Sequence, residues 1–238
     1  MQWRNDRTVL EAATAVAERL GGDVTHTVAS AAMDLSGRVH TAVNVSHFTG
    51  GPCAELAVLG AAAAVSDDPI MTIVAVADAG RGVIPPCGRC RQVLLDLQSQ
   101  VLVLMPGDGD DDPVGTPVRD LLPGAYDWPD ARAQRVVRFA GRYHDDVLAG
   151  RKTATIRFRD PQGIGPTTFV FEDEHADGFV TADAVVDSVT VKRVREIDDA
   201  DARDEGVGDV AALRDGLTGH YPQLGDDDLV EVVRFRVV

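Results

Sequence analysis

The chain has 238 residues, of which 45% are hydrophobic and 26% charged, a composition that fits a soluble globular protein and argues against a collagen, a coiled coil or a disordered chain. Its formal charge is −15, from 38 acidic and 23 basic residues, which argues against nucleic-acid binding, because phosphate contacts need clustered Lys and Arg. The longest nearly uncharged apolar run, 56–65, is too short to cross a bilayer, and the N-terminus has no secretory pattern. We therefore expect a cytoplasmic protein with no membrane or nucleic-acid partner.

Residues 1–130 alternate between helical and strand patterns. In chain order, the predicted elements are a helix at 8–20, two strands within 28–45, an Ala-rich helix that begins after the Gly-Gly-Pro step at 50–52, a buried strand at 72–78, a second Pro-led helix up to 98, and a strand at 101–105. This order predicts an α/β domain of three layers with a mixed sheet.

A polar, aperiodic stretch at 129–134 predicts a linker, after which the chain becomes rich in strands. The predicted elements are a short helix near 143–148, strands at 153–158, 167–173, 181–194 and 229–238, and a helix around 208–217. This pattern predicts a small β-rich second domain with peripheral helices over 135–238.

The chain's three cysteines have the spacing of metal ligands. An odd number of cysteines without an export signal argues against a disulfide framework. Cys53 follows Pro52, and Cys87 and Cys90 form a C-x-x-C after Pro86. We expect each Pro at the first helical position, so that the thiols lie in first turns, where N–H groups and the helix dipole favour thiolates. Three protein ligands leave a fourth position open, which is typical of catalytic zinc.

Glu55 lies two residues after Cys53, where both side chains can reach one ion. A C-x-E together with P-C-x-x-C is the pattern of zinc deaminases, in which a glutamate that is not a ligand moves protons. In that mechanism zinc activates water for attack on C4 of a cytosine ring. Glu55 takes the proton of the water, passes it to N3 and then protonates the leaving amine. The alternatives are a structural cysteine-zinc site, three buried thiols, or a metal-binding module without activity.

Three runs, NVSHFTGGPCAELAVLGAAAA, RGVIPPCGRCRQVLLDL and RDLLPGAYDW, strongly resemble the blasticidin S deaminases of the cytidine deaminase superfamily, over most of residues 8–128. The resemblance implies an α/β/α fold, Zn²⁺ as cofactor, a homotetramer, and a cytosine nucleoside (cytidine, deoxycytidine or a blasticidin S-like compound) as substrate. It implies zinc ligation by Cys53, Cys87 and Cys90, proton transfer by Glu55, and substrate contacts from Asn44, Ala54, Tyr126 and Trp128. For the last two, packing of a chain end is the alternative.

Two departures from the cytidine deaminases affect the substrate and the metal. Ser46 stands where those enzymes have a Glu that holds the ribose 3′-hydroxyl, so a different sugar is plausible. Leu56 stands where many enzymes with three cysteines have an Arg that offsets thiolate charge. Three thiolates on Zn²⁺ leave a net negative charge, so we assign this role to Arg89 or Arg91.

The stretch RYHDDVLAGRKTATIRFRD resembles the ASCH domain, a PUA-like β-barrel, and especially the small ASCH amidohydrolases that act on N4-acetylcytidine. The resemblance implies that Thr155 is a nucleophile, that Lys152 is its base and that Glu205 orients the Lys or the leaving amine. The alternatives are a structural appendage and an RNA- or nucleotide-binding face that would direct the deaminase to RNA. The fusion suggests that an N4-acyl group is removed at Thr155 before the freed amine is removed at the zinc.

Overall fold

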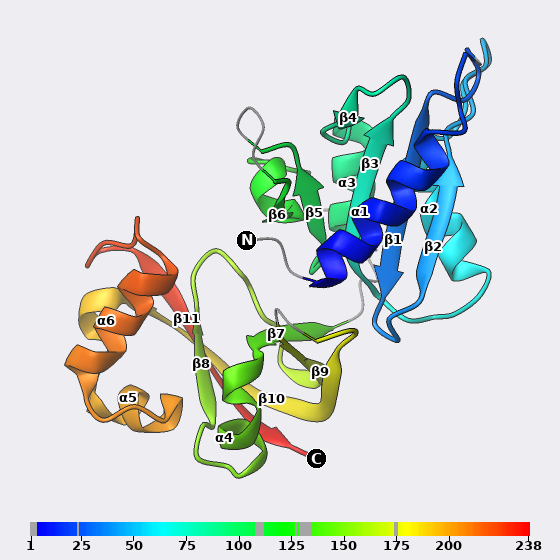
Figure 1. Cartoon of the computed structure of the whole chain (residues 1–238). Coiled ribbons are helices and arrows are strands. Elements are labelled where there is room, and N and C mark those ends of the chain that lie inside the picture. Colours follow the sequence, from blue (N-terminus) through cyan, green and yellow to red (C-terminus); the bar gives the residue numbers. More distant parts are fainter. Residues whose placement is uncertain (1–3, 23, 108–111, 127, 129–134, 174–175) are drawn as a thin grey trace. The chain divides into compact units, whose positions relative to one another are not determined.

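The computed structural model describes residues 4–22, 24–107, 112–126, 128, 135–173 and 176–238 (Figure 1). The chain divides into two compact units. The first comprises Met1–Gln134 and Asp173–Phe179, and the second comprises Arg135–Glu172 and Val180–Val238. The linker predicted at 129–134 lies outside the described residues. Within the described residues, no helix is both long and apolar enough to cross a membrane.

The first unit contains the predicted mixed sheet. Its elements are α1 (Arg4–Ala17), β1 (Val28–Asp34), β2 (Val39–Val43), α2 (Ala54–Ala63), β3 (Ile70–Ala77), β4 (Gly82–Val83), α3 (Gly88–Leu97), β5 (Leu102–Met105), β6 (Val114–Pro117) and the 3-10 helix η1 (Val118–Leu121). The strand order is β2-β1-β3-β5-β6, and β4 pairs with β3. β3 and β5 are parallel and the other pairs are antiparallel. The predicted order of elements is confirmed, and β4, β6 and η1 are additions to it.

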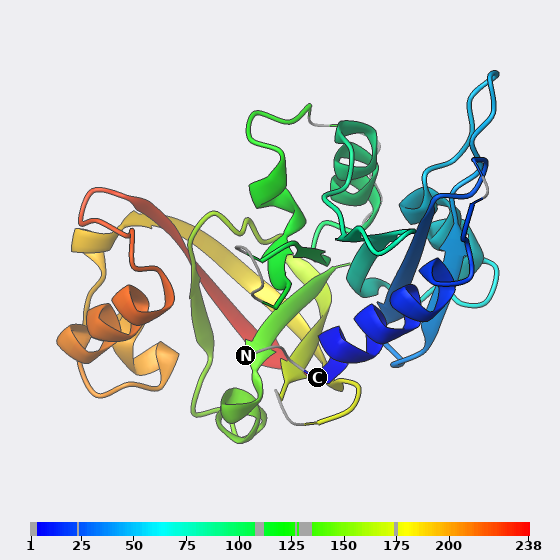
Figure 2. The ribbon, with the colours of Figure 1, turned by 45° about the horizontal axis from the view of Figure 1, so that its top comes forward.

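Helices cover both faces of this sheet, which makes the three layers (Figures 1 and 2). β3 is buried along its whole length, and its side chains alternate between the faces. Val74 and Val76 pack with Val9 and Ala13 of α1. Ile73 packs instead in the cluster that contains residues of α2 and α3. The α/β/α architecture is therefore confirmed.

Asp34, at the end of β1, closes the β1–β2 hairpin. Its buried carboxylate accepts a hydrogen bond from Nε of Arg38 and contacts Nε2 of His40, both at 2.9 Å. Burial acts to raise the pKa of Asp34, but the bonds to His40 and Arg38 outweigh it and lower the pKa below its ordinary value.

The second unit is a five-stranded sheet with helices at its ends. Its elements are β7 (Val136–Ala140), η2 (Gly141–Tyr143), α4 (His144–Leu148), β8 (Ala154–Arg157), β9 (Gly165–Glu172), β10 (Val180–Arg193), η3 (Val194–Glu196), α5 (Asp199–Glu205), α6 (Val210–His220) and β11 (Leu229–Val237). The strand order is β7-β9-β10-β11-β8, in which only β7 and β9 are parallel. The sheet curls along the long β10, which carries a bulge near 186–188 (Figure 2). The predicted β-rich domain is confirmed. Its strands form a curled sheet with β7 and β8 at the edges, where the resemblance predicts a β-barrel.

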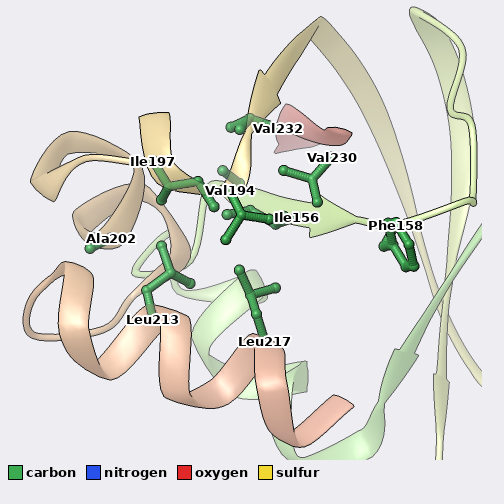
Figure 3. Close-up of a cluster of buried hydrophobic side chains, with 10 residues drawn as sticks. Ile156, Phe158, Val194, Ile197, Ala202, Leu213, Leu217, Val230 and Val232 are labelled. Carbon is green, nitrogen blue, oxygen red and sulfur yellow. The ribbon is translucent and has the colours of Figure 1, made fainter. Parts of the chain in front are cut away.

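Two apolar clusters hold the second unit together. One is aromatic and includes Phe139, Phe169, Phe171 and Phe235. The other packs α5 and α6 against β8 and β11. In Figure 3, the leucines at positions 213 and 217 point from α6 toward the apolar side chains at positions 156 and 194. This second cluster fixes α5, and with it the side chain at the end of that helix, beside β8.

Candidate active site

The three cysteines lie at the starts of two neighbouring helices. Cys53 is the N-cap of α2 and Cys87 is the N-cap of α3, both with extended backbone, and Cys90 is the third residue of α3. Pro52 and Pro86 therefore precede the caps, and the prediction that they occupy the first helical position is wrong. The extended conformation of the cap suits the thiol, because its side chain can then face the free N–H groups of the first turn.

The sulfur atoms have the spacing of a tetrahedral zinc site. The Sγ atoms of Cys53 and Cys87 are 3.7 Å apart, and those of Cys87 and Cys90 are 3.6 Å apart. All three lie within 4.8 Å of one another. A tetrahedron with Zn–S bonds of 2.3 Å has an edge of about 3.8 Å, so the trio fits three corners of such a site.

The electrostatics of the trio also favour a cation. Burial, together with the Glu55 carboxyl and the other two sulfurs, raises the pKa of the fully buried Cys90 thiol. Burial likewise raises the pKa of Cys53. For Cys87, burial acts in the same direction, but hydrogen bonds from the Cys90 and Arg89 backbone and from the neighbouring thiols lower its pKa. Three adjacent thiolates need a compensating charge, which a divalent metal ion would supply.

Glu55, the second residue of α2, is buried next to these sulfurs, and only 6% of it is exposed. Burial raises the pKa of its carboxyl. Together with Cys53 and Cys87 it lines a cavity of about 340 Å³. The other lining residues are Val28, Asn44, Val45, Ser46, His47, Gly51, Pro52, Ala54, Ile84 and Pro85. The structure thus brings two of the three cysteines, a buried carboxyl and two of the four predicted substrate contacts, Asn44 and Ala54, to one cavity.

Asn44 is fixed by the backbone that surrounds it. Its Oδ1 accepts hydrogen bonds from the N–H groups of Thr27 (2.7 Å) and Val28 (2.9 Å). Its Nδ2 donates to Oγ of Ser46 at 3.2 Å. The carbonyl end of the side chain is therefore occupied, and the amide nitrogen has two hydroxyl partners, since it also donates to Oγ1 of Thr27 at 3.5 Å.

Gly51 shapes the cavity wall, a role that the sequence analysis missed. The loop folds back so that the N–H of Val45 donates to the carbonyl of Pro52 at 3.1 Å. A Cβ on Gly51 would lie 1.8 Å from the carbonyl oxygen of Val45. Only glycine fits this close approach, and the Gly-Gly-Pro step at 50–52 was the available signal.

Arg89 and Arg91, the two candidates for offsetting thiolate charge, have different surroundings. Arg91 is tied to two carbonyls, since Nε donates to Pro86 (2.8 Å) and Nη1 donates to Leu121 (2.9 Å). The side chain of Arg89 is exposed. Arg91 thereby fixes the segment that precedes Cys87, and the electrostatic role of either Arg stays a prediction.

Tyr126 and Trp128 are not among the described residues that line the cavity. Tyr126 is 69% exposed and Trp128 is 40% exposed. The backbone carbonyl of Tyr126 accepts a hydrogen bond from Nε2 of Gln92 at 2.9 Å, which attaches this segment to α3. Their contact with substrate stays a prediction.

A second cluster of chemically active groups lies in the second unit. Nζ of Lys152, just before β8, contacts Oε2 of Glu205 and the carbonyl of the same residue at 3.3 Å. The other carboxylate oxygen of Glu205 accepts the N–H of Ile156 at 2.7 Å. The structure therefore brings together Lys152 and Glu205, which the sequence separates by 53 residues.

Most of this second cluster is shielded from solvent, with 3% of the Lys152 side chain and 11% of the Glu205 side chain exposed. Lys152 and Thr155 are buried, and Thr155 lies in β8 opposite Val233 of β11. Burial, reinforced by the Arg157 guanidinium, lowers the pKa of Lys152 to about 7 even though Glu205 contacts its ammonium. An amine with this pKa is available as a base near neutral pH, and the role of the Thr155 hydroxyl as the group that it activates stays a prediction.

Charged contacts along α5 hold Glu205 in place. Asp201, which is fully buried, contacts Nζ of Lys192 (2.5 Å) and Nη2 of Arg234 (2.9 Å). Asp204 accepts from Nε of the same Arg234 at 2.9 Å. Because the helix ends at Glu205, these contacts from β10 and β11 set where its carboxylate meets Lys152.

Comparison with known proteins associates the chain with deaminases. No protein-family model matches the chain. It is 38% identical to a cytidine deaminase of Mycobacterium tuberculosis over 112 residues. This match covers 45% of this chain and 78% of the relative. It is 30% identical over 132 residues to the blasticidin-S deaminase of Bacillus cereus, which covers 52% of this chain and 93% of the relative.

Solved structures resemble parts of the chain. The crystal structure of a cytidine deaminase from M. tuberculosis is 33% identical, with a TM-score of 0.40, over 51% of this chain and 94% of that one. An ASCH domain from Lactobacillus crispatus is 18% identical, with a TM-score of 0.34, over 43% of this chain and 79% of that one. The two sequence relatives, each matched over most of its own length, show that the chain belongs to the cytidine deaminase family, together with the blasticidin-S deaminases.

Proposed function

We propose that the first unit is a zinc-dependent aminohydrolase that converts a cytosine nucleoside to its uracil form. The observation that carries this proposal is the cysteine trio, spaced for a tetrahedral metal, beside a buried glutamate on the same cavity. The activities named for its relatives, cytidine deaminase and blasticidin-S deaminase, support the same chemistry.

Cys53, Cys87 and Cys90 would hold Zn²⁺, which lowers the pKa of water and so supplies a nucleophile for C4 of the base at neutral pH. Glu55 takes the proton of the attacking water on its carboxylate and delivers it to N3. It then takes the proton of the new C4 hydroxyl and passes it to the 4-amino group, which leaves as ammonia as the C4–N bond breaks and the C4 carbonyl forms. Burial suits Glu55 to this task, because a raised pKa lets a carboxyl act as base and acid in turn.

The residues beside Asn44 bear on which nucleoside enters the cavity. Ser46 offers a neutral hydroxyl next to the Asn44 amide, and a neutral hydroxyl holds a sugar hydroxyl less strongly than a carboxylate does. We therefore include blasticidin S with cytidine and deoxycytidine as candidate substrates. A homotetramer in the cytoplasm is part of the same proposal.

For the second unit, we propose an ASCH-type domain that hydrolyses an N4-acylcytosine. Lys152 takes the proton of the Thr155 hydroxyl, whose oxygen attacks the acyl carbonyl. The C–N4 bond breaks, N4 leaves as a free amine with a proton from Lys152, and water then releases the acyl group as an acid. The buried contact between Lys152 and Glu205 supports this assignment, and the freed amine is the leaving group that the zinc site requires.

A substrate panel tests both activities. Zinc content is measured by mass spectrometry, and loss of cytosine absorbance is followed with cytidine, deoxycytidine and blasticidin S. We expect about one zinc per chain and turnover of at least one compound. Glu55→Gln should keep the zinc and lose about 10²- to 10⁴-fold in turnover. No turnover of any compound by the zinc-loaded protein would contradict the deaminase.

N4-acetylcytidine, followed by chromatography, separates the two steps. The parent chain should yield cytidine and then uridine, Glu55→Gln should accumulate cytidine, and Thr155→Val should leave the compound intact. If the parent leaves it intact and binds RNA in a salt-dependent manner, the RNA-binding alternative for the second unit is favoured instead.

A further inference from the structure

The buried Lys152 is covered by an aromatic ring that also carries a second cation. Nζ of Lys152 lies 4.9 Å from the centre of the Tyr143 ring. The guanidinium carbon of Arg142 lies 4.8 Å from the same point. The two cations are therefore less than about 10 Å apart, one buried and the other exposed at the rim of the site.

Arg142 is held at this rim by neutral groups. Its Nη2 donates to the Tyr143 hydroxyl and to Nε2 of His220, both at 3.1 Å. Because a guanidinium only donates, Nε2 of His220 accepts, and the imidazole is neutral. Among the described residues, none of the contacts of Arg142 is with a carboxylate.

Some other exposed arginines of this acidic chain do have a carboxylate partner. Arg38, Arg195 and Arg236 each contact an aspartate. Burial lowers the pKa of His220, and the positive charges of Arg142, Arg157 and Lys152 lower it further. The surroundings of this imidazole are therefore positively charged. Two of these three cations have a carboxylate partner, since Lys152 contacts Glu205 and Arg157 lies 3.4 Å from Asp160. Among the described residues, the third cation, Arg142, has none.

We propose that Arg142 and His220 form a subsite for a phosphate monoester, so that the ligand of the Lys152 site is a nucleoside 5′-monophosphate. The planar guanidinium fork matches phosphate oxygens, and the neutral imidazole, whose Nε2 accepts from Arg142, has its other ring N–H left to donate to them. The base would then lie at Lys152, whose amine is less than about 10 Å from the Arg142 guanidinium, a span that one nucleotide can bridge. This inference rests on the proposal that the second unit binds an acylated cytosine, and it assigns the phosphorylated form as the preferred one.

Calorimetric titration of the Thr155→Val chain tests the subsite without turnover. The probes are N4-acetylcytidine and its 5′-monophosphate, and the quantity measured is the ratio of their dissociation constants. We expect the monophosphate to bind at least about tenfold more tightly, as one charge-assisted bidentate contact allows. Arg142→Gln and His220→Gln, each added to this chain, should bring the ratio close to one. Arg236→Gln, which removes an exposed arginine that has a carboxylate partner, should leave the ratio unchanged.

Equal binding of the two probes would overturn the inference, and so would a preference that survives both rim substitutions. The outcome is separable from that of the proposed hydrolysis. If the parent chain hydrolyses neither probe but the preference and its loss are observed, the hydrolysis is wrong and the anion subsite stands. If the parent hydrolyses N4-acetylcytidine but shows no preference, the hydrolysis stands and the subsite is wrong.

Discussion

Replacing Gly51 by Ala should damage the deaminase cavity through a single methyl group. The new Cβ would lie 1.8 Å from the Val45 oxygen, whereas real Cβ atoms essentially never come closer than 3.0 Å to such an atom. The obstructing atom belongs to the backbone, so the loop between Val45 and Cys53 must shift by roughly 1 Å or more. Overpacking of this kind costs about 1–3 kcal/mol, which corresponds to a fall of about 3–10 °C in the melting temperature of a unit of this size.

The same shift should reduce activity, because Val45, Ser46 and Cys53 all line the cavity. Misplacing groups by about 1 Å can lower turnover by about 100-fold. Gly60→Ala is the matched control, since Gly60 lies inside α2 with nothing within 4 Å of an added Cβ. It should raise the unfolding free energy by about 0.5–1 kcal/mol and leave turnover unchanged. Calorimetry measures the change in melting temperature, and the absorbance assay measures the change in turnover. A Gly51→Ala protein as stable and as active as the parent would refute the reasoning.

Four further outcomes follow from the charged groups. Asp201→Asn should lower the unfolding free energy by about 3–5 kcal/mol, because it breaks a buried ionic network. Asp187→Asn, which removes one partner of an exposed ion pair, should lower it by less than about 1 kcal/mol. Urea denaturation of the two variants measures this difference. Since the pKa of Asp34 is lowered in the folded state, its contribution is complete above about pH 4 and is lost as the pH falls further, so the difference in stability between the parent and Asp34→Asn should shrink only in acid. If Lys152 is the base, hydrolysis of N4-acetylcytidine should rise with pH through about 7, and a rate independent of pH from 5 to 9 would contradict this role. Arg89→Ala should lower cytidine turnover with the zinc content unchanged, and unchanged turnover would remove this residue from the account.

The elements that the sequence predicted are those with strong local patterns. The apolar run of β3 and the Ala-rich α2 need no information from elsewhere in the chain. β6 and α5 were missed for physical reasons. β6 is four residues long and includes Gly and Pro, and it is a strand because it pairs with β5. The helix α5, DADARDE, has no apolar periodicity and depends on ion pairs with β10 and β11.

The candidate site divides in the same way. The two Pro-Cys steps and Glu55 could be recognised because their chemistry is written in short spacings. Gly51 escaped notice because its importance comes from the fold of a loop that brings Val45 against it. The grouping of Arg142 with His220 was not foreseen either, since 78 residues separate them and the ASCH-like run that begins at Arg142 does not include His220.

X-ray absorption at the zinc edge of the purified chain tests the central claim most directly. The account predicts one zinc with three sulfur ligands at about 2.3 Å and one lighter ligand at about 2.0 Å, because only three cysteines are present and the fourth corner must stay available to water. Fewer than three sulfur ligands, or a fourth ligand that proves to be a protein side chain, would contradict it.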